Sequence, residues 1–105
     1  MKKYTVGELT RTFIELNTFI SNWKNYGLND DDLFEFEIIL MQNSKDHPVI
    51  QGTGGLRKAR FVPERLNKGK SGGFRVIYLD LEDSQIIILL VAKQLVEILK
   101  RHYGR

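Results

Sequence analysis

The sequence predicts a single α+β domain, and three observations support this. The chain has 105 residues, the size of one domain with one core. Its composition, 42% apolar and 28% charged, is that of an ordinary globular protein. Its periodicities change along the chain in the order β-α-α-β-β-β-α, which is typical of a sheet with helices on one face.

The first elements are short. Residues 1–10 are expected to be mobile, as chain ends usually are. Thr12–Leu16 alternates β-branched and apolar residues and predicts a strand. A helix is expected over Phe19–Tyr26, with Gly27 as its stop.

A second, longer helix is expected from about Asp30 to Asn43. Asn29 and Asp30 can cap its first turn, and the aspartates suit the positive end of the helix dipole. Apolar residues recur along it at helical spacing, so this helix should lie against the sheet.

The second half of the chain predicts three strands in an antiparallel meander, over Leu56–Val62, Gly73–Leu81 and Gln85–Ala92. A closing helix is expected over Gln94–Tyr103. The junction between Ala92 and Lys93 is unusual because no turn residue separates the strand from this helix. Either the strand bends directly into the helix or a segment is missing, and the second interpretation is favoured.

Several classes of function are excluded by composition. The chain has no cysteine, so disulfides, thiolate metal sites and thiol nucleophiles are absent. Its longest apolar run, from Ile86 to Ala92, is far shorter than a membrane helix, and the first residues lack the apolar core of a secretory signal. A cytoplasmic location without membrane contact is therefore expected.

Three local patterns do not amount to sites. Gly69-Lys70-Ser71 resembles the end of a phosphate-binding loop, but Glu64 stands where that motif needs its first glycine. His47 and His102 lack clustered co-ligands, so no metal is expected. Phe19 and Trp23 lie one helical turn apart and suit the core, with a partner-binding groove as the alternative.

Charge is strongly partitioned along the chain. Between Leu28 and Pro48, six acids face one base. Between Gly52 and Arg75, seven bases face one acid, Glu64. This polarity predicts an electrostatic field focused on one face and a partner rich in phosphate, most simply RNA. The candidate RNA-binding residues outside the central strip are Arg57, Arg65, Lys68 and Lys70.

The strip itself follows from strand alternation. Lys58 and Arg60 point to one face of their strand, and Arg75 can point to the same face of the next. Three cations held together repel one another unless an anion lies between them. The sequence therefore predicts that Lys58, Arg60 and Arg75 converge in a hollow that binds a polyanion.

Two stretches carry a resemblance to a known family. They are Gly52-Thr53-Gly54-Gly55-Leu56-Arg57-Lys58, within the longer stretch from Val49 to Phe61, and Gly72-Gly73-Phe74-Arg75-Val76-Ile77-Tyr78. Over about residues 12 to 92, the chain resembles the RelE/ParE superfamily of toxins from bacterial type II toxin–antitoxin systems, particularly the HigB-like branch.

The resemblance implies a RelE-like, microbial RNase-like fold, with an antiparallel sheet, two N-terminal helices and a C-terminal helix packed on it. It implies a ribosome-dependent mRNA endonuclease that needs no metal or other cofactor. A cognate antitoxin, often of the helix-turn-helix type, would mask it. By position, Lys58, Arg60 and Arg75 match catalytic residues of the family. Arginine cannot act as a base at neutral pH, so both arginines would clamp the transition state, and Lys58 is a candidate general acid.

The chain departs from the family after Ala92, where relatives continue with further catalytic groups before the last helix. Losing such a group can cost about 10²–10⁴-fold in rate. Alternatives are therefore an impaired toxin remnant that still binds antitoxin or ribosome, and a ParE-like inhibitor of DNA gyrase. An unrelated RNA-binding module fits less well, because base-stacking aromatics do not alternate with the basic residues.

Overall fold

The computed structural model describes residues 1–66 and 72–95. Within them, five strands, two α-helices and two 3-10 turns follow one another along the chain. In order they are β1 (Lys2–Val6), β2 (Leu9–Glu15), α1 (Asn17–Asn25), α2 (Asp30–Asn43), β3 (Arg57–Phe61), η1 (Glu64–Leu66), β4 (Phe74–Leu81), η2 (Glu82–Ser84) and β5 (Ile86–Gln94).

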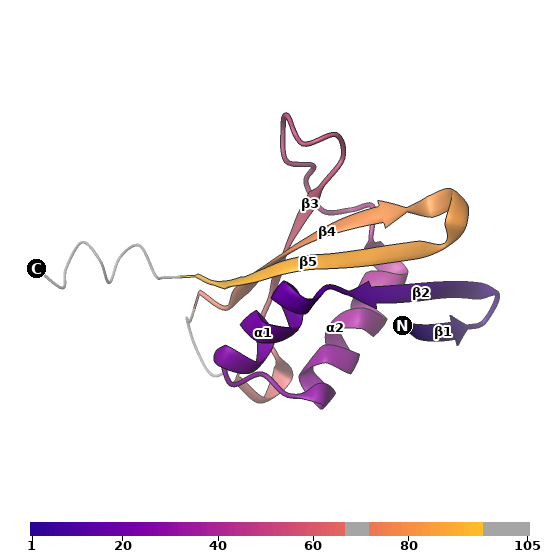
Figure 1. The fold of residues 1–105 in the computed structure, drawn as a ribbon. Helices are drawn as coiled ribbons and strands as arrows, with labels where there is room; N and C mark the ends of the chain where they lie inside the picture. The colour runs from indigo at the N-terminus through magenta and orange to yellow at the C-terminus, as the bar shows by residue number, and fades with distance from the viewer. Residues whose placement is uncertain (67–71, 96–105) are drawn as a thin grey trace, which may run out of the picture.

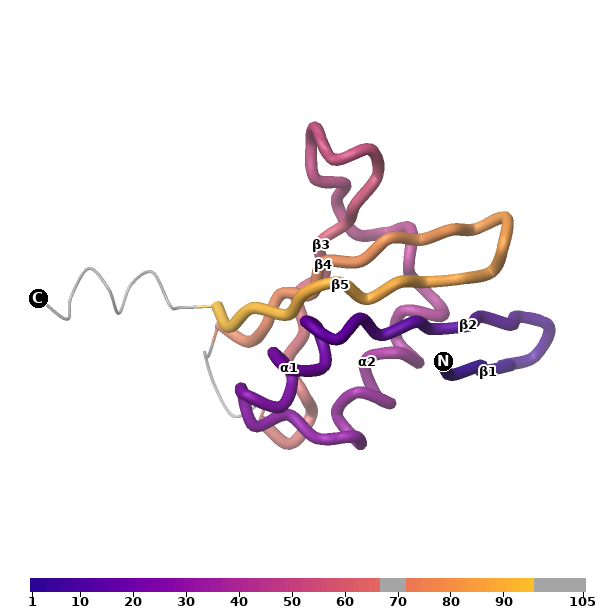
Figure 2. Tube along the Cα trace, viewed as in Figure 1, coloured from indigo at the N-terminus to yellow at the C-terminus, as the bar shows by residue number. Residues whose placement is uncertain are grey.

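The five strands form one sheet in the order β1-β2-β5-β4-β3. The meander of β3, β4 and β5 is antiparallel, as expected. The sheet as a whole is mixed, because β2 pairs with β5 in parallel. This pairing brings the β1–β2 and β4–β5 turns to the same end of the sheet, opposite to the end at which β5 stops at Gln94 (Figure 2).

Both helices lie on one side of the sheet, which confirms the α+β class (Figure 1). The core between the layers is aromatic, because each helix contributes rings that meet rings from the sheet. Trp23 of α1 stacks on Phe61 of β3 with ring centroids 6.0 Å apart, and Phe36 of α2 lies 5.1 Å from the same ring. Phe19 and Trp23 are both buried, as core packing predicts.

The long helix begins where the sequence indicates. Asn29 is its N-cap, and its side chain accepts a hydrogen bond from the Asp32 backbone N–H at 2.8 Å. The Asp32 carboxylate accepts one from the Asn29 N–H at 2.9 Å, so the capping box is complete. Such reciprocal bonds satisfy donors that a helix start otherwise leaves unpaired.

The first residues of the chain are ordered, although the sequence predicted a mobile segment over residues 1–10. Residues 2–6 form β1, an edge strand antiparallel to β2, and Gly7 (φ 62°) makes the turn between them. Tyr4 anchors this strand: its ring meets Phe13 edge-on at 5.7 Å, and its hydroxyl donates to Glu37 Oε1 at 2.9 Å. These contacts join residues far apart in sequence, so local pattern does not show them.

At the other end, the expected strand boundary at Ala92 is wrong. Strand β5 continues through Lys93 to Gln94, and its partners on β4 follow without a break, from Val76 opposite Ala92 to Arg75 opposite Lys93. Strand β5 therefore extends through the junction where the absence of a turn suggested a missing segment, and the missing segment itself stays a prediction. The predicted closing helix does not begin at Gln94, and the rest of it lies outside the described residues.

A buried carboxyl cluster joins the N-terminal hairpin to α2. Glu37 of α2 is fully buried and Glu15 of β2 lies beside it. Burial and the contact with Glu15 raise the pKa of Glu37 to about 8. The pKa of Glu15 is lowered: burial raises it, but the hydrogen bond from Glu37 and the ion pair with Lys2 outweigh that. At neutral pH, Glu37 is therefore protonated and Glu15 is ionised.

This cluster makes stability depend on pH. The folded-state pKa of Glu37 is above that of an unfolded glutamate, so its contribution to stability is complete below the unfolded value and is lost as pH rises through about 8. We expect the free energy of unfolding in urea to fall between about pH 5 and about pH 8. Glu37→Gln should weaken this dependence, and an unchanged slope in that variant would contradict the assignment.

Neither α1 nor α2 has the length and apolar composition needed to cross a bilayer, and no other α-helix lies in the described ranges.

Candidate nucleic-acid interface

Basic residues lie side by side across three adjacent strands. Arg60 of β3 is the register partner of Arg75 of β4, and Arg75 is in turn the partner of Lys93 of β5. Directly opposed residues of an antiparallel ladder project from the same face. Lys58 lies two residues before Arg60 on that face, opposite Ile77. We call these four residues, Lys58, Arg60, Arg75 and Lys93, the basic row.

The basic row projects from the side of the sheet that faces away from the helices. Its neighbours along each strand, Ala59 and Phe61 on β3 and Phe74 and Val76 on β4, are buried in the core. Because strand side chains alternate, residues between them point the other way. The structure thus brings Lys58, Arg60 and Arg75 together on one face, in agreement with the predicted geometry. That the surface there is hollow stays a prediction.

Two glycines allow the chain to approach closely at this end of the sheet. A Cβ on Gly73, which has φ 74°, would lie 2.6 Å from Val62 Cγ2, and one on Gly72 would lie 2.7 Å from the Leu95 carbonyl oxygen. The Gly72 carbonyl also accepts a hydrogen bond from Arg60 Nε at 2.8 Å. The glycine pair therefore positions the start of β4 and orients the guanidinium of Arg60.

Lys93 is the member of the row that sequence reasoning missed. The apolar run ends at Ala92, and the residues after Lys93 suggested a helix, so Lys93 was expected at a helix start. The length of the strand predicted over Gly73–Leu81 could have indicated the position of Lys93, because Phe74 and Arg75 at its start need partners on the next strand. Extension of β5 to Gln94 supplies them.

Within the described residues, Lys58, Arg75 and Lys93 form no ion pair with a carboxylate. Like charges opposite one another destabilise a sheet. Cations that lie close together without a carboxylate partner, as these three do in the described part of the chain, are typical of a surface that binds an anion.

The other predicted RNA-binding residues lie elsewhere. Arg57 points to the opposite face and donates to the backbone carbonyls of His47 at 2.7 Å and Lys45 at 3.2 Å. Arg65, in η1, makes two hydrogen bonds to the carboxylate of Asp32, at 2.7 and 2.9 Å. Both guanidiniums are thus engaged within the protein, and their role toward RNA stays a prediction. Lys68 and Lys70 lie outside the described residues.

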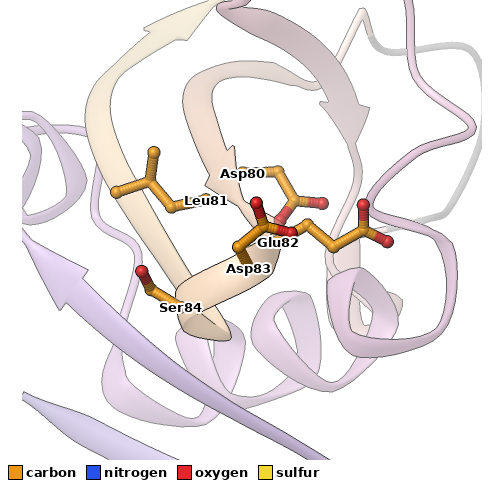
Figure 3. Close-up of a pocket in the computed structure, with 5 residues that line it drawn as sticks. All are labelled: Asp80, Leu81, Glu82, Asp83 and Ser84. Atoms are coloured by element: carbon orange, nitrogen blue, oxygen red, sulfur yellow. The ribbon is translucent and has the colours of Figure 1, made fainter.

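The opposite end of β4 is acidic. A cavity of about 450 Å³ is lined there by Asp80, Leu81, Glu82, Asp83 and Ser84 (Figure 3). Asp80 is held by Arg11 and Ser44, and Glu82 pairs with Lys45. Carboxylates repel phosphate, so this cavity does not suit a nucleic acid. In the described ranges, no cluster of three or more acidic or histidine side chains is arranged to hold a metal ion.

Comparison with solved structures places this geometry in a known fold. The toxin RelE of Escherichia coli, solved as an arginine-substituted mutant in the free state, superposes with a TM-score of 0.56. The match covers 80% of this chain and 82% of that one, at 10% sequence identity. The chain has a RelE-like fold. No protein-family profile matches the sequence. At such low identity the likeness establishes the architecture, and the chemistry must be argued from the residues of this chain.

Proposed function

We propose that this chain is the toxin of a type II toxin–antitoxin module, of the HigB-like branch, and that it cleaves mRNA on the ribosome in the cytoplasm. One observation carries the proposal: on a RelE-like fold, Arg60, Arg75 and Lys93 face one another across three strands, with Lys58 beside them. The spacing of neighbouring strands, about 4.8 Å, suits several cations acting on one phosphate group and its neighbours.

The proposed reaction needs no cofactor. The RNA 2′-oxygen attacks the adjacent phosphorus, its proton passes to a solvent water molecule, and the bond from phosphorus to the 5′-oxygen breaks. The products are a 2′,3′-cyclic phosphate and a 5′-hydroxyl. Negative charge grows on the phosphate oxygens in the transition state, and fixed cations stabilise it more than the ground state.

Each member of the row has a proposed role. Arg60 and Arg75 remain charged at any physiological pH and hold the phosphate oxygens. Lys58 is the candidate general acid that protonates the leaving 5′-oxygen. Lys93 adds a fourth positive charge to the row, next to Ala92, after which the family that the chain resembles carries further catalytic groups. A cognate antitoxin, of the helix-turn-helix type in many such modules, would mask this face.

A second candidate function is that of an impaired remnant that binds antitoxin or ribosome without cutting. The observation that favours it is the composition of the row: the residues that flank its cations on the same face, Ile77 and Val91, are apolar. The described positions on this face of β3, β4 and β5 hold no imidazole or carboxylate between the cations that could take the proton from the 2′-hydroxyl.

Primer extension on cellular mRNA after induced expression separates these functions. We expect new 5′ ends inside open reading frames, at positions linked to codons, because cleavage takes place on translating ribosomes. An impaired remnant would produce no new ends. A ParE-like protein would also produce none but would inhibit DNA supercoiling by gyrase, so either result would overturn the proposal.

A further inference from the structure

A second site lies on the helix side of the sheet, away from the basic row. A cavity of about 490 Å³ opens between β1, α1 and the start of α2. This volume is in the range of small-molecule sites. Phe19 and Trp23, the pair for which the sequence left a groove as the alternative to core packing, form part of its lining.

The walls of this cavity are aromatic. Tyr4, Phe19, Trp23 and Phe34 all line it. Phe34 is 53% exposed, although its ring meets the ring of Tyr4 with centroids 5.7 Å apart. Aromatic faces carry a negative quadrupole and attract cations as well as apolar groups.

The polar end of the cavity is a carboxylate that already holds an ammonium group. Glu15 lines the cavity, and Lys2 Nζ lies 3.0 Å from its Oε2 and 3.8 Å from Glu37 Oε1. The Lys2 side chain lines the cavity and is 38% exposed, so it approaches Glu15 from the solvent side of the cavity. Lys24 and Asp30 also line the cavity, with opposite charges.

We propose that this cavity is a binding site for a small primary amine with an aromatic or aliphatic body. The ammonium group would replace Lys2 beside Glu15, and the apolar body would lie against Trp23 and Phe34. The ammonium group of Lys2 then competes with the ligand for Glu15 and forms the ion pair with Glu15 when no ligand is bound. A buried carboxylate without a cation is costly, so the site favours either the lysine or a ligand of the same chemistry.

Trp23 is the only tryptophan of the chain, so its fluorescence reports on the cavity directly. The test is a titration at neutral pH with three matched probes: phenethylamine, 2-phenylethanol and 3-phenylpropanoate. We expect saturable binding of the amine, about tenfold tighter than the alcohol, and no saturable binding of the carboxylate. Equal affinities for amine and alcohol, or no saturable response, would overturn the proposal.

Variants sharpen this test. Lys2→Met should tighten amine binding, by about tenfold, because the competitor is removed while Glu15 remains. Lys3→Met is the matched control: Lys3 is the next residue of β1, points to the other face and should leave the affinity unchanged. Weaker or unaltered binding in a folded Lys2→Met protein would contradict the role of Lys2.

Phe34→Ala gives an independent arm, since an exposed residue can be replaced without loss of the fold. It should weaken amine binding by about threefold to tenfold, through loss of one aromatic wall. If this variant bound phenethylamine as tightly as the parent protein, the amine would lie elsewhere. The site is separate from the basic row, so these outcomes do not depend on whether the protein cleaves RNA.

Discussion

Replacing Arg75 with glutamate should abolish the growth inhibition that the proposed function predicts on induced expression of the protein. Arg75 stands in the middle of the basic row, opposite both Arg60 and Lys93. The substitution puts a negative charge where the phosphate would lie, so transition-state stabilisation is lost and the phosphate is repelled. We expect the cleavage rate to fall by at least about 10²-fold, as when one oxyanion donor is removed.

The fold should survive this change. Arg75 projects from the face opposite the core and is only partly buried, so the variant should keep the circular dichroism spectrum of the parent. Lys3→Glu provides the control, because it reverses an exposed charge on β1, at the far edge of the same sheet. Full toxicity in a folded Arg75→Glu protein would remove Arg75 from the site.

Replacing Arg11 with methionine should have the largest effect on stability. Arg11 of β2 pairs with Asp80 of β4, and both side chains are almost fully buried. Asp80 also accepts a hydrogen bond from Ser44 at 2.6 Å, which alone cannot compensate a buried carboxylate. Breaking a buried ion pair by removing one partner costs about 3–5 kcal/mol, and urea unfolding at neutral pH measures this loss.

The chain offers a matched exposed pair as a control. Lys45 and Glu82 also form an ion pair, but both side chains are more than half exposed. Lys45→Met should therefore cost less than about 1 kcal/mol. The double change of Arg11→Met with Asp80→Leu should recover much of the stability lost in the single variant. Equal losses at the buried and the exposed pair would show that burial of Arg11 is not what makes it important.

The sequence predicted the central part of the fold well because its signals there are local. Alternation along β3 and β4 placed Lys58, Arg60 and Arg75 on one face, and the register requires no more than a regular antiparallel pairing. The capping signal at Asn29 fixed the start of α2 in the same way. These elements follow from periodicity and from turn chemistry within a few residues.

The elements that the sequence did not predict depend on contacts between residues far apart in the chain. Strand β1 is stabilised through Tyr4 by Phe13 and Glu37, and a short polar strand at a chain end carries little signal of its own. Lys93 extends β5 because β4 offers partners, although the sequence after it has a helical pattern.

The interactions of Arg57 and Arg65 were equally hidden. A count of basic residues cannot show which guanidinium groups are hydrogen-bonded within the protein. Arg57 donates to a backbone carbonyl group, and Arg65 donates to the carboxylate of Asp32.

The most direct test is mRNA cleavage in a purified translation system, with the parent protein and Arg75→Glu compared at equal concentration. The proposed function predicts cuts that require ribosomes, with 2′,3′-cyclic phosphate on the upstream fragment, and no cuts by the variant. Intact mRNA with the parent protein, or equal cleavage by both, would contradict a catalytic role for the row.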